Sequence, residues 1–490
     1  MTNFATLDPA TLTAQHWFFC GIGGSGMLPL AMILRGLGAE VAGSDRSRDQ
    51  GRSPEKFGWL EAQGFALHPQ DGSGITGADQ VLVASAAVED TVPEMVRARE
   101  LGCQRMSRAE LLAALFNAAP ACIAVGGTSG KSTVTGMLGW IMAEAGREPT
   151  IMNGAVMKNF VSPTALFASA RVGSGALFVS EVDESDGSIA LYRPTVAVLN
   201  NVSLDHKSLE ELRQLFGDFL ARADVAALNL DDAETAALAP HAKAVISFGI
   251  ARQDADLYVL PATIVEQSTA LTATLRDARD DSRHDLMLAV PGRHNLANAL
   301  AAIAGAAAAG VTVAESVKHL ATFKGLARRF DIVGTSAHGV TVIDDFGHNP
   351  EKVAATLATM KAHPGRVIAF FQPHGYGPLR QMGAELAEVL GTRLGAEDRV
   401  ILCDPVYFGG IVDRTPGSAR IVELVRLSAD GGAPDEGPPK TGPIAEYIAA
   451  REDCATRIIE LARPGDRVVI MGARDDTLSA FARDVLTRLE

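Results

Sequence analysis

Residues 121–133 read ACIAVGGTSGKST, an apolar run that passes directly into a glycine-rich turn and then into a helical pattern. Glycines let successive backbone N–H groups face a phosphate, and the N-terminus of the following helix adds positive potential. A short apolar run bounded in this way is typical of a buried strand in a parallel sheet. The stretch therefore predicts an α/β domain with a phosphate-binding loop between a strand and a helix.

The turn itself, GGTSGKST at residues 126–133, predicts an ATP site; a turn with an exposed lysine is the alternative. We expect Lys131 to contact the β- and γ-phosphates and the hydroxyl of Ser132 to bind Mg²⁺. Val125 stands where the general pattern G-x-x-x-x-G-K-[ST] begins with glycine, so the loop is one residue shorter than that pattern. The residues expected to bind the cofactor here are Gly127, Thr128, Ser129, Gly130, Lys131, Ser132 and Thr133.

Two polar stretches follow the next predicted strands, 176–180 and 195–199. The first is EVDESD at 181–186, whose carboxylates repel one another unless a cation or solvent offsets them. The carboxyl end of a strand is where α/β proteins build ligand sites, so the cluster predicts a hard-cation site, with a solvated acidic turn as the alternative. The second is NNVSLDH at 200–206, in which His206 is a candidate metal ligand, although a lone histidine is more often structural.

A second glycine-rich turn, GIGGSGM at 21–27, follows the apolar run 17–20. It contains G-x-G-x-x-G, and Asp45 follows about twenty residues later, which is a dinucleotide-binding pattern. The same turn can hold any diphosphate, including that of a UDP-sugar. The substrate-binding residues expected in this segment are Gly23, Gly24, Ser25, Gly26, Asp45 and Ser85.

Alternating strand and helix patterns divide the chain into three α/β segments, 1–117, 118–326 and 327–490. Alternating stretches between 245 and 288 predict added β structure in the second segment. The third segment has strand patterns at 340–343, 367–371, 399–403 and 467–471, and a Gly/Pro-rich surface loop is expected at 430–443. We expect Rossmann-like outer domains and a P-loop ATPase-like central domain.

Composition limits the classes of partner. The chain has 490 residues, 47% of them hydrophobic and 21% charged, with a net charge of −14. A net negative charge of this size repels the phosphate backbone, so no nucleic-acid partner is predicted. The five scattered cysteines indicate reduced thiols in a cytoplasmic protein, and no signal peptide is recognised.

The apolar segment 297–310 is shorter than the roughly 20 residues of a membrane span, so no membrane insertion is predicted and a buried helix is expected.

Three later motifs add candidate residues: PGRHNLAN at 291–298, ARRF at 327–330 and DDFGHNP at 344–350. Asn295 and Asn298 are three apart, so they would share one helical face, and their amides could read an adenine edge. Arg329 could hold phosphate oxygens. Each motif alone is more often structural than functional.

The ordered set GIGGSGM, GGTSGKST, EVDESD, NNVSLDH, PGRHNLANA, LARRF and IDDFGHNP resembles the Mur ligase family, over about residues 16–380. The closest branch is the one that adds L-alanine to UDP-N-acetylmuramate. The resemblance implies domains for UDP-sugar, for ATP and for the amino acid. It also implies that ATP phosphorylates the sugar carboxylate and that the amine of the amino acid attacks the acyl phosphate, in peptidoglycan precursor synthesis.

The resemblance also implies roles for single residues. Lys131 would hold the transferring phosphate, while Ser132 and Glu181, or Glu184 in second place, would bind Mg²⁺. His206 would bind a second Mg²⁺, and Arg329 would meet phosphate. The remaining family positions are Asn295 and Asn298 for adenine and Asp344 or Asp345 for ribose. Two further substrate-binding candidates are His348 and Arg380, and we expect Arg380 to contact the carboxylate of the amino acid.

This sequence departs from the family pattern near the expected amino-acid site. Gly375 stands where the family has arginine, and Pro378 where a second arginine is usual. Phe346 and Asn349 replace a usual Tyr and His. Elsewhere, Ser129 replaces the histidine of the alanine-adding branch, and the sequence DHKS at 205–208 replaces a usual DHxD.

Three other functions compete with an alanine-adding ligase. A paralogue could use another amino acid or a peptide, including a recycled muropeptide. A non-catalytic protein could sense ATP, but it would not need a second metal site. An NAD-dependent oxidoreductase built on GIGGSGM would leave the P-loop without a role.

Overall fold

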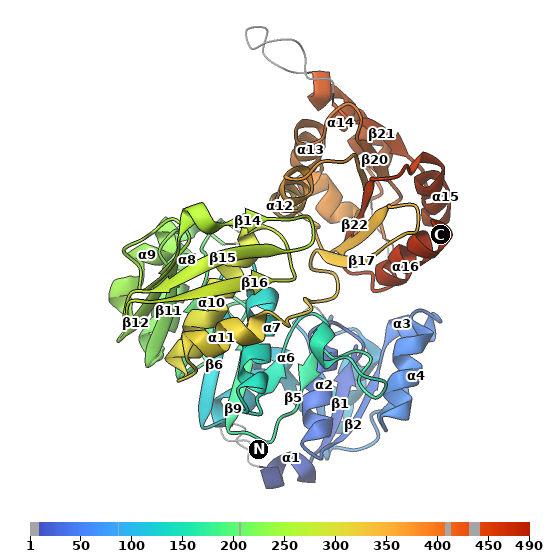
Figure 1. Ribbon diagram of the computed structural model, residues 1–490. Helices are drawn as coiled ribbons and strands as arrows, with labels where there is room; N and C mark the ends of the chain where they lie inside the picture. The colour runs from blue at the N-terminus through green and yellow to red at the C-terminus, as the bar shows by residue number, and fades with distance from the viewer. Residues whose placement is uncertain (1–8, 87, 205–206, 407–412, 431–441) are drawn as a thin grey trace. The chain divides into compact units, whose positions relative to one another are not determined.

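The structure, a computed structural model, describes residues 9–86, 88–204, 207–406, 413–430 and 442–490 (Figure 1). It divides into two compact units, Met1–Glu266 with Ala270–Gly325 and Leu326–Glu490 with Gln267–Thr269. The first unit holds two sheets and the second holds one. The predicted three-domain α/β fold is confirmed, whereas the exact boundaries at 117 and 326 stay predictions.

The N-terminal sheet is fully parallel, with strand order β3-β2-β1-β4-β5. Its central strand β1 is apolar and buried except at its first residue, as expected of a strand covered on both faces. Strands β2 and β3 are added on one side of β1, and β4 and β5 on the other side. Doubly wound sheets bind ligands at such a change in strand order, here between β1 and β4. The strands are β1 (His16–Cys20), β2 (Glu40–Ser44), β3 (Ala66–His68), β4 (Gln80–Ala84) and β5 (Gln104–Ser107).

Helices cover both faces of this sheet. Helix α6 begins with a capping box, in which the side chains of Ser107 and Glu110 each accept a backbone N–H of the other residue. Helix α2 begins instead at Gly26 and has no side-chain cap. The helices are α1 (Pro9–Ala14), α2 (Met27–Gly36), α3 (Arg46–Asp49), α4 (Pro54–Ala62), α5 (Pro93–Leu101) and α6 (Arg108–Ala118).

The central sheet has eleven strands and two parts. Seven strands, β6, β7 and β9 to β13, form its parallel part, and β8 pairs antiparallel with β7. Strands β14 to β16 extend it as an antiparallel addition, which confirms the β structure predicted between 245 and 288. The strands are β6 (Ala121–Gly126), β7 (Thr150–Met152), β8 (Ala170–Arg171), β9 (Leu177–Glu181), β10 (Val196–Leu199), β11 (Val225–Asn229), β12 (Val245–Gly249), β13 (Leu257–Val259), β14 (Val265–Glu266), β15 (Leu271–Asp277) and β16 (Ser282–Leu288).

Helix α7 (Lys131–Glu144) follows the P-loop and packs against α10 (Arg293–Ala308). The alanine-rich part of α10 is almost entirely buried, as predicted, because small side chains let neighbouring backbones approach closely. Among the described residues, no helix is both long and apolar enough to cross a membrane. The other helices of this part are α8 (Leu209–Arg222), α9 (Ala233–Ala237) and α11 (Val313–Leu320).

The second unit contains a six-stranded sheet of order β17-β18-β22-β19-β20-β21, parallel except for β17. Its strands are β17 (Asp331–Thr335), β18 (Thr341–Asp345), β19 (Val367–Gln372), β20 (Arg399–Leu402), β21 (Ile444–Tyr447) and β22 (Arg467–Gly472). Its helices are α12 (Pro350–Lys361), α13 (Tyr376–Arg393), α14 (Ser418–Asp430), α15 (Arg451–Leu461) and α16 (Leu478–Arg488). The loop predicted at 430–443 lies largely outside the described residues.

Candidate active site

The P-loop joins β6 to α7 as predicted, and two of its glycines have positive φ. Gly130, at φ +81°, precedes α7 without a side-chain cap. A Cβ on Gly130 would lie 2.5 Å from Oδ1 of Asn298, and one on Gly127 would lie 3.2 Å from the carbonyl oxygen of Asn201. Glycine is therefore required at 130 by both conformation and close packing.

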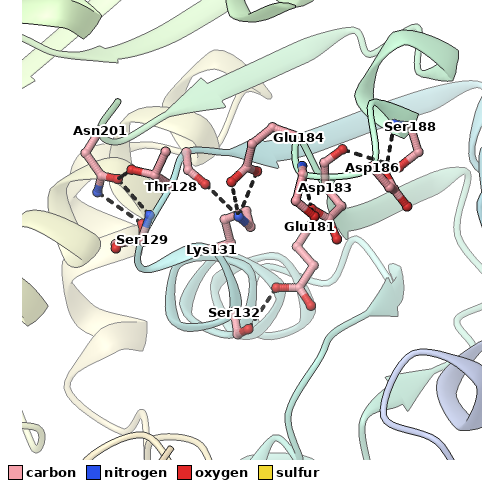
Figure 2. Close-up of polar contacts among 12 residues, drawn as sticks. Thr128, Ser129, Lys131, Ser132, Glu181, Asp183, Glu184, Asp186, Ser188 and Asn201 are labelled. Carbon is pink, nitrogen blue, oxygen red and sulfur yellow. Dashed lines mark hydrogen bonds and ion pairs between the residues drawn. The ribbon is translucent and has the colours of Figure 1, made fainter. Parts of the chain in front are cut away.

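Asn201, at the end of β10, holds the outer part of the loop (Figure 2). Its Oδ1 accepts hydrogen bonds from the N–H of Ser129 at 2.8 Å and from the hydroxyl of Thr128 at 3.0 Å. Its Nδ2 donates to the carbonyl of Ser129 at 3.0 Å. One amide thus fixes the loop backbone through both its donor and its acceptor.

Lys131 points to the acidic stretch (Figure 2). Its Nζ lies 2.8 Å from Oε2 and 3.1 Å from Oε1 of Glu184, and it donates to the carbonyl of Gly127 at 2.7 Å. The Glu184 side chain is buried, and burial raises its pKa although the adjacent Lys131 acts in the opposite direction. The ammonium group is therefore held at the loop by a carboxylate that is itself poorly solvated.

Ser132 and Glu181 form the pair that could hold a cation (Figure 2). The Ser132 hydroxyl donates to Oε2 of Glu181 at 2.8 Å. Gly154 makes room for this carboxylate, because a Cβ there would lie 2.3 Å from Oε1 of Glu181. A hydroxyl beside a carboxylate is a hard oxygen donor set, which fits Mg²⁺.

The other two acidic residues of EVDESD are engaged locally. Burial alone would raise the pKa of Asp183, but hydrogen bonds from the hydroxyl and N–H of Ser185 outweigh it and hold that pKa below its usual range. Asp186 accepts the N–H of Ser188 at 2.8 Å, and its Oδ2 lies 3.5 Å from Nη2 of Arg108. Of the acidic stretch, Glu181 and Glu184 are therefore the members that reach the P-loop.

The predicted second metal ligand, His206, lies outside the described residues, as does Asp205. Within the described part of the chain, no group of three or more His, Cys, Asp or Glu side chains is placed to hold a metal ion. Thr133 lies in the first turn of α7. Its contact with the cofactor stays a prediction.

Asn295 and Asn298 share one face of α10, as predicted, and both are buried. The Oδ1 of Asn298 accepts from Nδ2 of Asn200 at 2.9 Å, and its Nδ2 donates to Oδ1 of Asn295 at 3.3 Å. The Nδ2 of Asn295 donates to the carbonyl of Pro291 at 2.7 Å. The structure brings Asn298 to the P-loop, and both amides support neighbouring groups; adenine recognition by them stays a prediction.

At the glycine turn of the first sheet, Asp45 has a structural role. Its Oδ2 accepts the N–H of Gly23 and its Oδ1 accepts the N–H of Ser47, both at 2.8 Å. The buried Lys56 donates to the carbonyl of Gly23 at 3.0 Å. The Asp45 carboxylate thus fixes the turn at Gly23 and caps helix α3 at Ser47, and its contact with a substrate stays a prediction.

The remaining N-terminal candidates lie at the carboxyl ends of β1 and β4. Gly24 and Ser25 belong to the turn after β1, and Gly26 ends that turn as the N-cap of α2. Ser85 follows β4 and lines a cleft of about 680 Å³, together with Arg105 and other residues of β4 to α6. Their contacts with a substrate stay predictions.

In the second unit, Arg328 and Arg329 lie against the ring of Phe346, with guanidinium carbons 5.0 and 4.4 Å from its centre. Arg328 and Phe330 both have positive φ, which is uncommon for such bulky residues. Arg328 donates to the carbonyls of Gly472 and Asp475 at 2.6 and 3.1 Å. Arg328 thus anchors a strained turn that presents Arg329, whose predicted phosphate contact stays a prediction.

Asp344 and Asp345 are both buried. Asp344 accepts the hydroxyl of Ser479 at 2.6 Å, and its Oδ1 lies 3.5 Å from Nε of Arg328. Burial raises the pKa of Asp344, although Arg328 opposes this effect. Asp345 accepts the N–H of Phe330 at 2.7 Å and the hydroxyl of Thr356 at 2.8 Å. Both carboxylates shape the turn, and the ribose contact stays a prediction.

His348 lies beside His374, with ring centres 5.2 Å apart. Burial lowers the pKa of His348 to about 3 and that of His374 to about 4, so both imidazoles are neutral near pH 7. Arg380 does not lie free: its Nη1 is 3.3 Å from Oδ2 of Asp413 and its Nη2 donates to the carbonyl of Asp413 at 3.1 Å. Its side chain is 47% exposed, so a substrate carboxylate could compete for it.

Open space surrounds the two glycines of this segment. A Cβ on Gly377 would meet no heavy atom within 4 Å, and one on Gly375 would meet only Cδ of Pro378, at 3.5 Å. Gly375 has φ +142° and is the N-cap of α13, which has no side-chain cap. The segment therefore has room where the resembling family carries arginine.

Sequence reasoning missed four residues that the structure brings into these sites: Lys56, Arg108, Asn200 and Arg328. Asn201 belongs to a motif that was recognised, but its support of the P-loop was not predicted. Arg328 stands inside the ARRF motif, and this position was the available signal. No sequence signal indicated Lys56 or Arg108, because neither residue belongs to a recognised motif.

Comparison with known proteins covers all three parts of the chain. Residues 16–119 match the model of the Mur ligase family, catalytic domain, residues 125–306 the Mur ligase middle domain, and residues 328–474 the Mur ligase, glutamate ligase domain. A UDP-N-acetylmuramate–L-alanine ligase of Acidithiobacillus ferrooxidans is 38% identical over 403 residues, covering 80% of this chain and 82% of its own length. The enzyme of the same name from Synechococcus sp. is 33% identical, with coverages of 99% and 89%.

Solved structures agree in fold. UDP-N-acetylmuramate–alanine ligase from Thermotoga maritima has a TM-score of 0.77 at 24% identity, covering 96% of this chain and 98% of its own. A murein peptide ligase from Psychrobacter arcticus has a TM-score of 0.71 at 23% identity, with coverages of 97% and 98%. The sequence relatives span most of the chain at more than 30% identity, and the family models cover each of its sheets. The chain therefore belongs to the Mur ligase family.

Proposed function

We propose that this chain is a cytoplasmic ATP-dependent ligase that forms an amide between the carboxylate of a UDP-N-acetylmuramate-type donor and an amino acid, with L-alanine the first candidate. The observation that carries the proposal is the paired arrangement at the P-loop. Lys131 meets Glu184 there, and the hydroxyl of Ser132 meets Glu181. This arrangement suits transfer of the γ-phosphoryl group of ATP to the donor carboxylate.

The residues of the P-loop fit ATP with Mg²⁺. Asn201 fixes the loop, and Gly130 precedes helix α7 as an N-cap without a side chain, so the first N–H groups of the helix can face phosphate. Ser132 and Glu181 would hold Mg²⁺, which neutralises charge on the phosphates. Lys131 would carry positive charge to the transferring phosphoryl group. Glu184 keeps the ammonium group of Lys131 beside the loop, and the phosphates of ATP would compete with Glu184 for this ammonium group.

The chemistry requires two displacements. A carboxylate oxygen of the donor attacks the γ-phosphorus, the bond to the bridging oxygen breaks, and ADP leaves with that electron pair. The amine nitrogen of the acceptor then attacks the carbonyl carbon of the acyl phosphate, phosphate leaves, and the nitrogen loses a proton to give the amide. The protein contributes chiefly position and charge neutralisation.

The N-terminal sheet is proposed to bind the UDP-sugar rather than NAD. The turn GIGGSGM lies at the position where doubly wound sheets bind diphosphates. Asp45, which would read the ribose of NAD, accepts the N–H of Gly23 in this turn with one carboxylate oxygen and caps helix α3 at Ser47 with the other. Calorimetry decides between the two: heat from a UDP-sugar and none from NAD is expected, and the reverse result would overturn the assignment.

A paralogue with another acceptor is the second candidate, and one observation favours it. The space at Gly375 gives the proposed acceptor region more room than the arginine usual at this position would leave, and open space also adjoins Gly377. We therefore expect at least one larger amino acid, or a small peptide, to compete with L-alanine.

A panel assay tests both candidates. Phosphate release is measured with ATP and Mg²⁺ over several UDP-sugars and acceptors, and the products are identified by mass spectrometry. ATP turnover that depends on both a UDP-N-acetylmuramate-type donor and an amine acceptor supports a ligase. ATP turnover that is indifferent to donor and acceptor would contradict it and support a nucleotide-binding protein without ligation.

A further inference from the structure

Arg108, the first residue of α6, lies between two loops of the first unit that belong to different sheets. On one side, its side chain packs on the glycine turn: a Cβ on Gly26 would lie 3.1 Å from Cδ, 3.4 Å from Nη1 and 3.5 Å from Nε of Arg108. On the other side, its Nη2 lies 3.5 Å from Oδ2 of Asp186, in the acidic stretch. One side chain thus connects the proposed donor site with the proposed ATP site.

The guanidinium of Arg108 has unused hydrogen-bonding capacity. Its side chain is only 21% exposed, yet within the described part of the chain it donates no hydrogen bond, and its ion pair with Asp186 is longer than a hydrogen bond of good geometry. A guanidinium offers five N–H donors in a planar fork, and phosphate oxygens match that fork. The N–H groups of Ser25 and Gly26, in the adjacent turn, also donate to no described residue.

We propose that Arg108 binds the diphosphate of the donor at the glycine turn and thereby couples the donor site to the acidic stretch of the ATP site. The proposal rests on the proposed function, because it takes the donor to be a nucleoside diphosphate sugar. Asp186 is the partner that the phosphate replaces. When Arg108 turns to the diphosphate, the acidic stretch that carries Glu184 loses a cationic neighbour. The affinity of the neighbouring site for ATP changes as a result.

Among the described residues, Arg108 also acts on two titratable groups besides Asp186, namely Asp183 and Tyr192. Burial alone would raise the pKa of Asp183, but hydrogen bonds from Ser185, with a smaller contribution from Arg108, hold it low. Burial raises the pKa of Tyr192, and Arg108 opposes this effect. Asp183 is held by Ser185 and Tyr192 is buried, so Asp186 is the carboxylate that can exchange with a substrate anion. This makes Asp186 the natural second position of the test.

The test measures binding without turnover, with UDP-N-acetylglucosamine as the probe because it has the diphosphate but lacks the reacting carboxylate. Calorimetry gives its affinity for the full-length protein and for the variants Arg108→Met, Arg108→Lys and Asp186→Asn. Arg97→Met is the matched control, an exposed arginine of α5 whose partner is Glu100. Circular dichroism and thermal melting verify that each variant is folded.

Arg108→Met is expected to weaken binding of the probe about ten- to a hundredfold, because charge-assisted contacts to phosphate are lost. Arg108→Lys recovers part of this loss, since it keeps the charge without the fork. Asp186→Asn and Arg97→Met leave the affinity for the probe within about twofold of wild type, or improve it for Asp186→Asn. If Asp186→Asn weakens the probe as much as Arg108→Met, Arg108 acts only as a structural bridge and the proposal is wrong.

Coupling is measured as the change in ATP affinity on saturation with the probe. In the wild type we expect a change of about fivefold or more, the usual lower range for linked sites. Both Arg108→Met and Asp186→Asn should abolish the change. Equal ATP affinity with and without probe in the wild type would overturn the coupling, whereas a wild type that binds neither ATP nor the probe would contradict the proposed function itself.

Discussion

The P-loop and the segment around Gly375 are both glycine-bearing turns between a parallel strand and an uncapped helix, yet their surroundings differ. At the P-loop, side chains of Asn201, Glu184 and Glu181 engage the loop backbone, the lysine and the serine. At Gly375 and Gly377, open space adjoins the glycines. The loop proposed to bind ATP is fixed by long-range contacts, whereas the segment proposed to bind the acceptor has no side chains at Gly375 and Gly377. We therefore expect substitutions at the P-loop to change ATP turnover and substitutions around Gly375 to change the choice of acceptor.

The largest expected effect comes from removing the charge at the P-loop. Lys131→Ala should lower kcat about a hundred- to a thousandfold or more, because an oriented charge on a phosphoryl transition state is worth about 3–4 kcal/mol. Steady-state ATP turnover measures it. Lys243→Ala is the control, since Lys243 is an exposed lysine paired with Asp224. ATP turnover near the wild-type rate in Lys131→Ala would contradict a role of the P-loop in phosphoryl transfer.

Glu181→Gln should come next, because it keeps volume while removing the charge beside Ser132. We expect kcat to fall about ten- to a hundredfold at ordinary Mg²⁺ and to recover in part as Mg²⁺ is raised, as for a weakened cation site. Activity titrated against Mg²⁺ is the measurement. Asp183→Asn is the comparison, since the Asp183 carboxylate accepts hydrogen bonds from Ser185 and none from the loop among the described residues. Full activity of Glu181→Gln would indicate that Glu184 or Asp183, and not Glu181, is the metal ligand.

Substitutions of Arg380 and Gly375 should have a smaller effect, on the choice of acceptor. Arg380→Ala should raise the KM of the acceptor about tenfold and leave the KM of ATP nearly unchanged, since a charge-assisted contact to a carboxylate contributes about 1.5–3 kcal/mol and Asp413 already shares this arginine. Gly375→Arg should narrow the acceptor range toward alanine. Gly375→Ala separates the added cation from the strain at φ +142°. Strict use of L-alanine by the wild type, with Arg380→Ala unchanged, would contradict this view of the segment.

The smallest effect is on stability. Above pH 6.5 the imidazoles of His348 and His374 are neutral in both folded and unfolded chains. As the pH falls from 6.5 toward about 4, the unfolded chain takes up protons that the folded chain refuses, so stability falls. The loss is about 1 kcal/mol per histidine at one pH unit below 6.5. Thermal melting should show a flatter acid limb for His348→Gln with His374→Gln than for the control His338→Gln; identical limbs would contradict buried neutral imidazoles.

Much of this comparison could be predicted from the sequence, because local patterns determine strands, turns and uncapped helices. The strand before the P-loop, for example, ends where its apolar run meets glycine. The partners of the loop could not be predicted in the same way. Asn201 meets Ser129 across 72 residues and Glu184 meets Lys131 across 53, and no periodicity encodes such pairs. Asp45 and Asp344 also have partners that their motifs did not predict: Asp45 accepts the N–H of Gly23, and Asp344 accepts the hydroxyl of Ser479 in α16. Their contacts with ligands stay predictions.

The central claim, that ATP activates the donor carboxylate as an acyl phosphate, is tested most directly with a heavy oxygen isotope. The donor carboxylate is labelled, the protein is supplied with ATP, Mg²⁺ and an amine acceptor, and the released phosphate is examined by mass spectrometry. We predict one labelled oxygen in each phosphate formed, with the other retained in the amide product. Unlabelled phosphate, or label in AMP, would contradict the account.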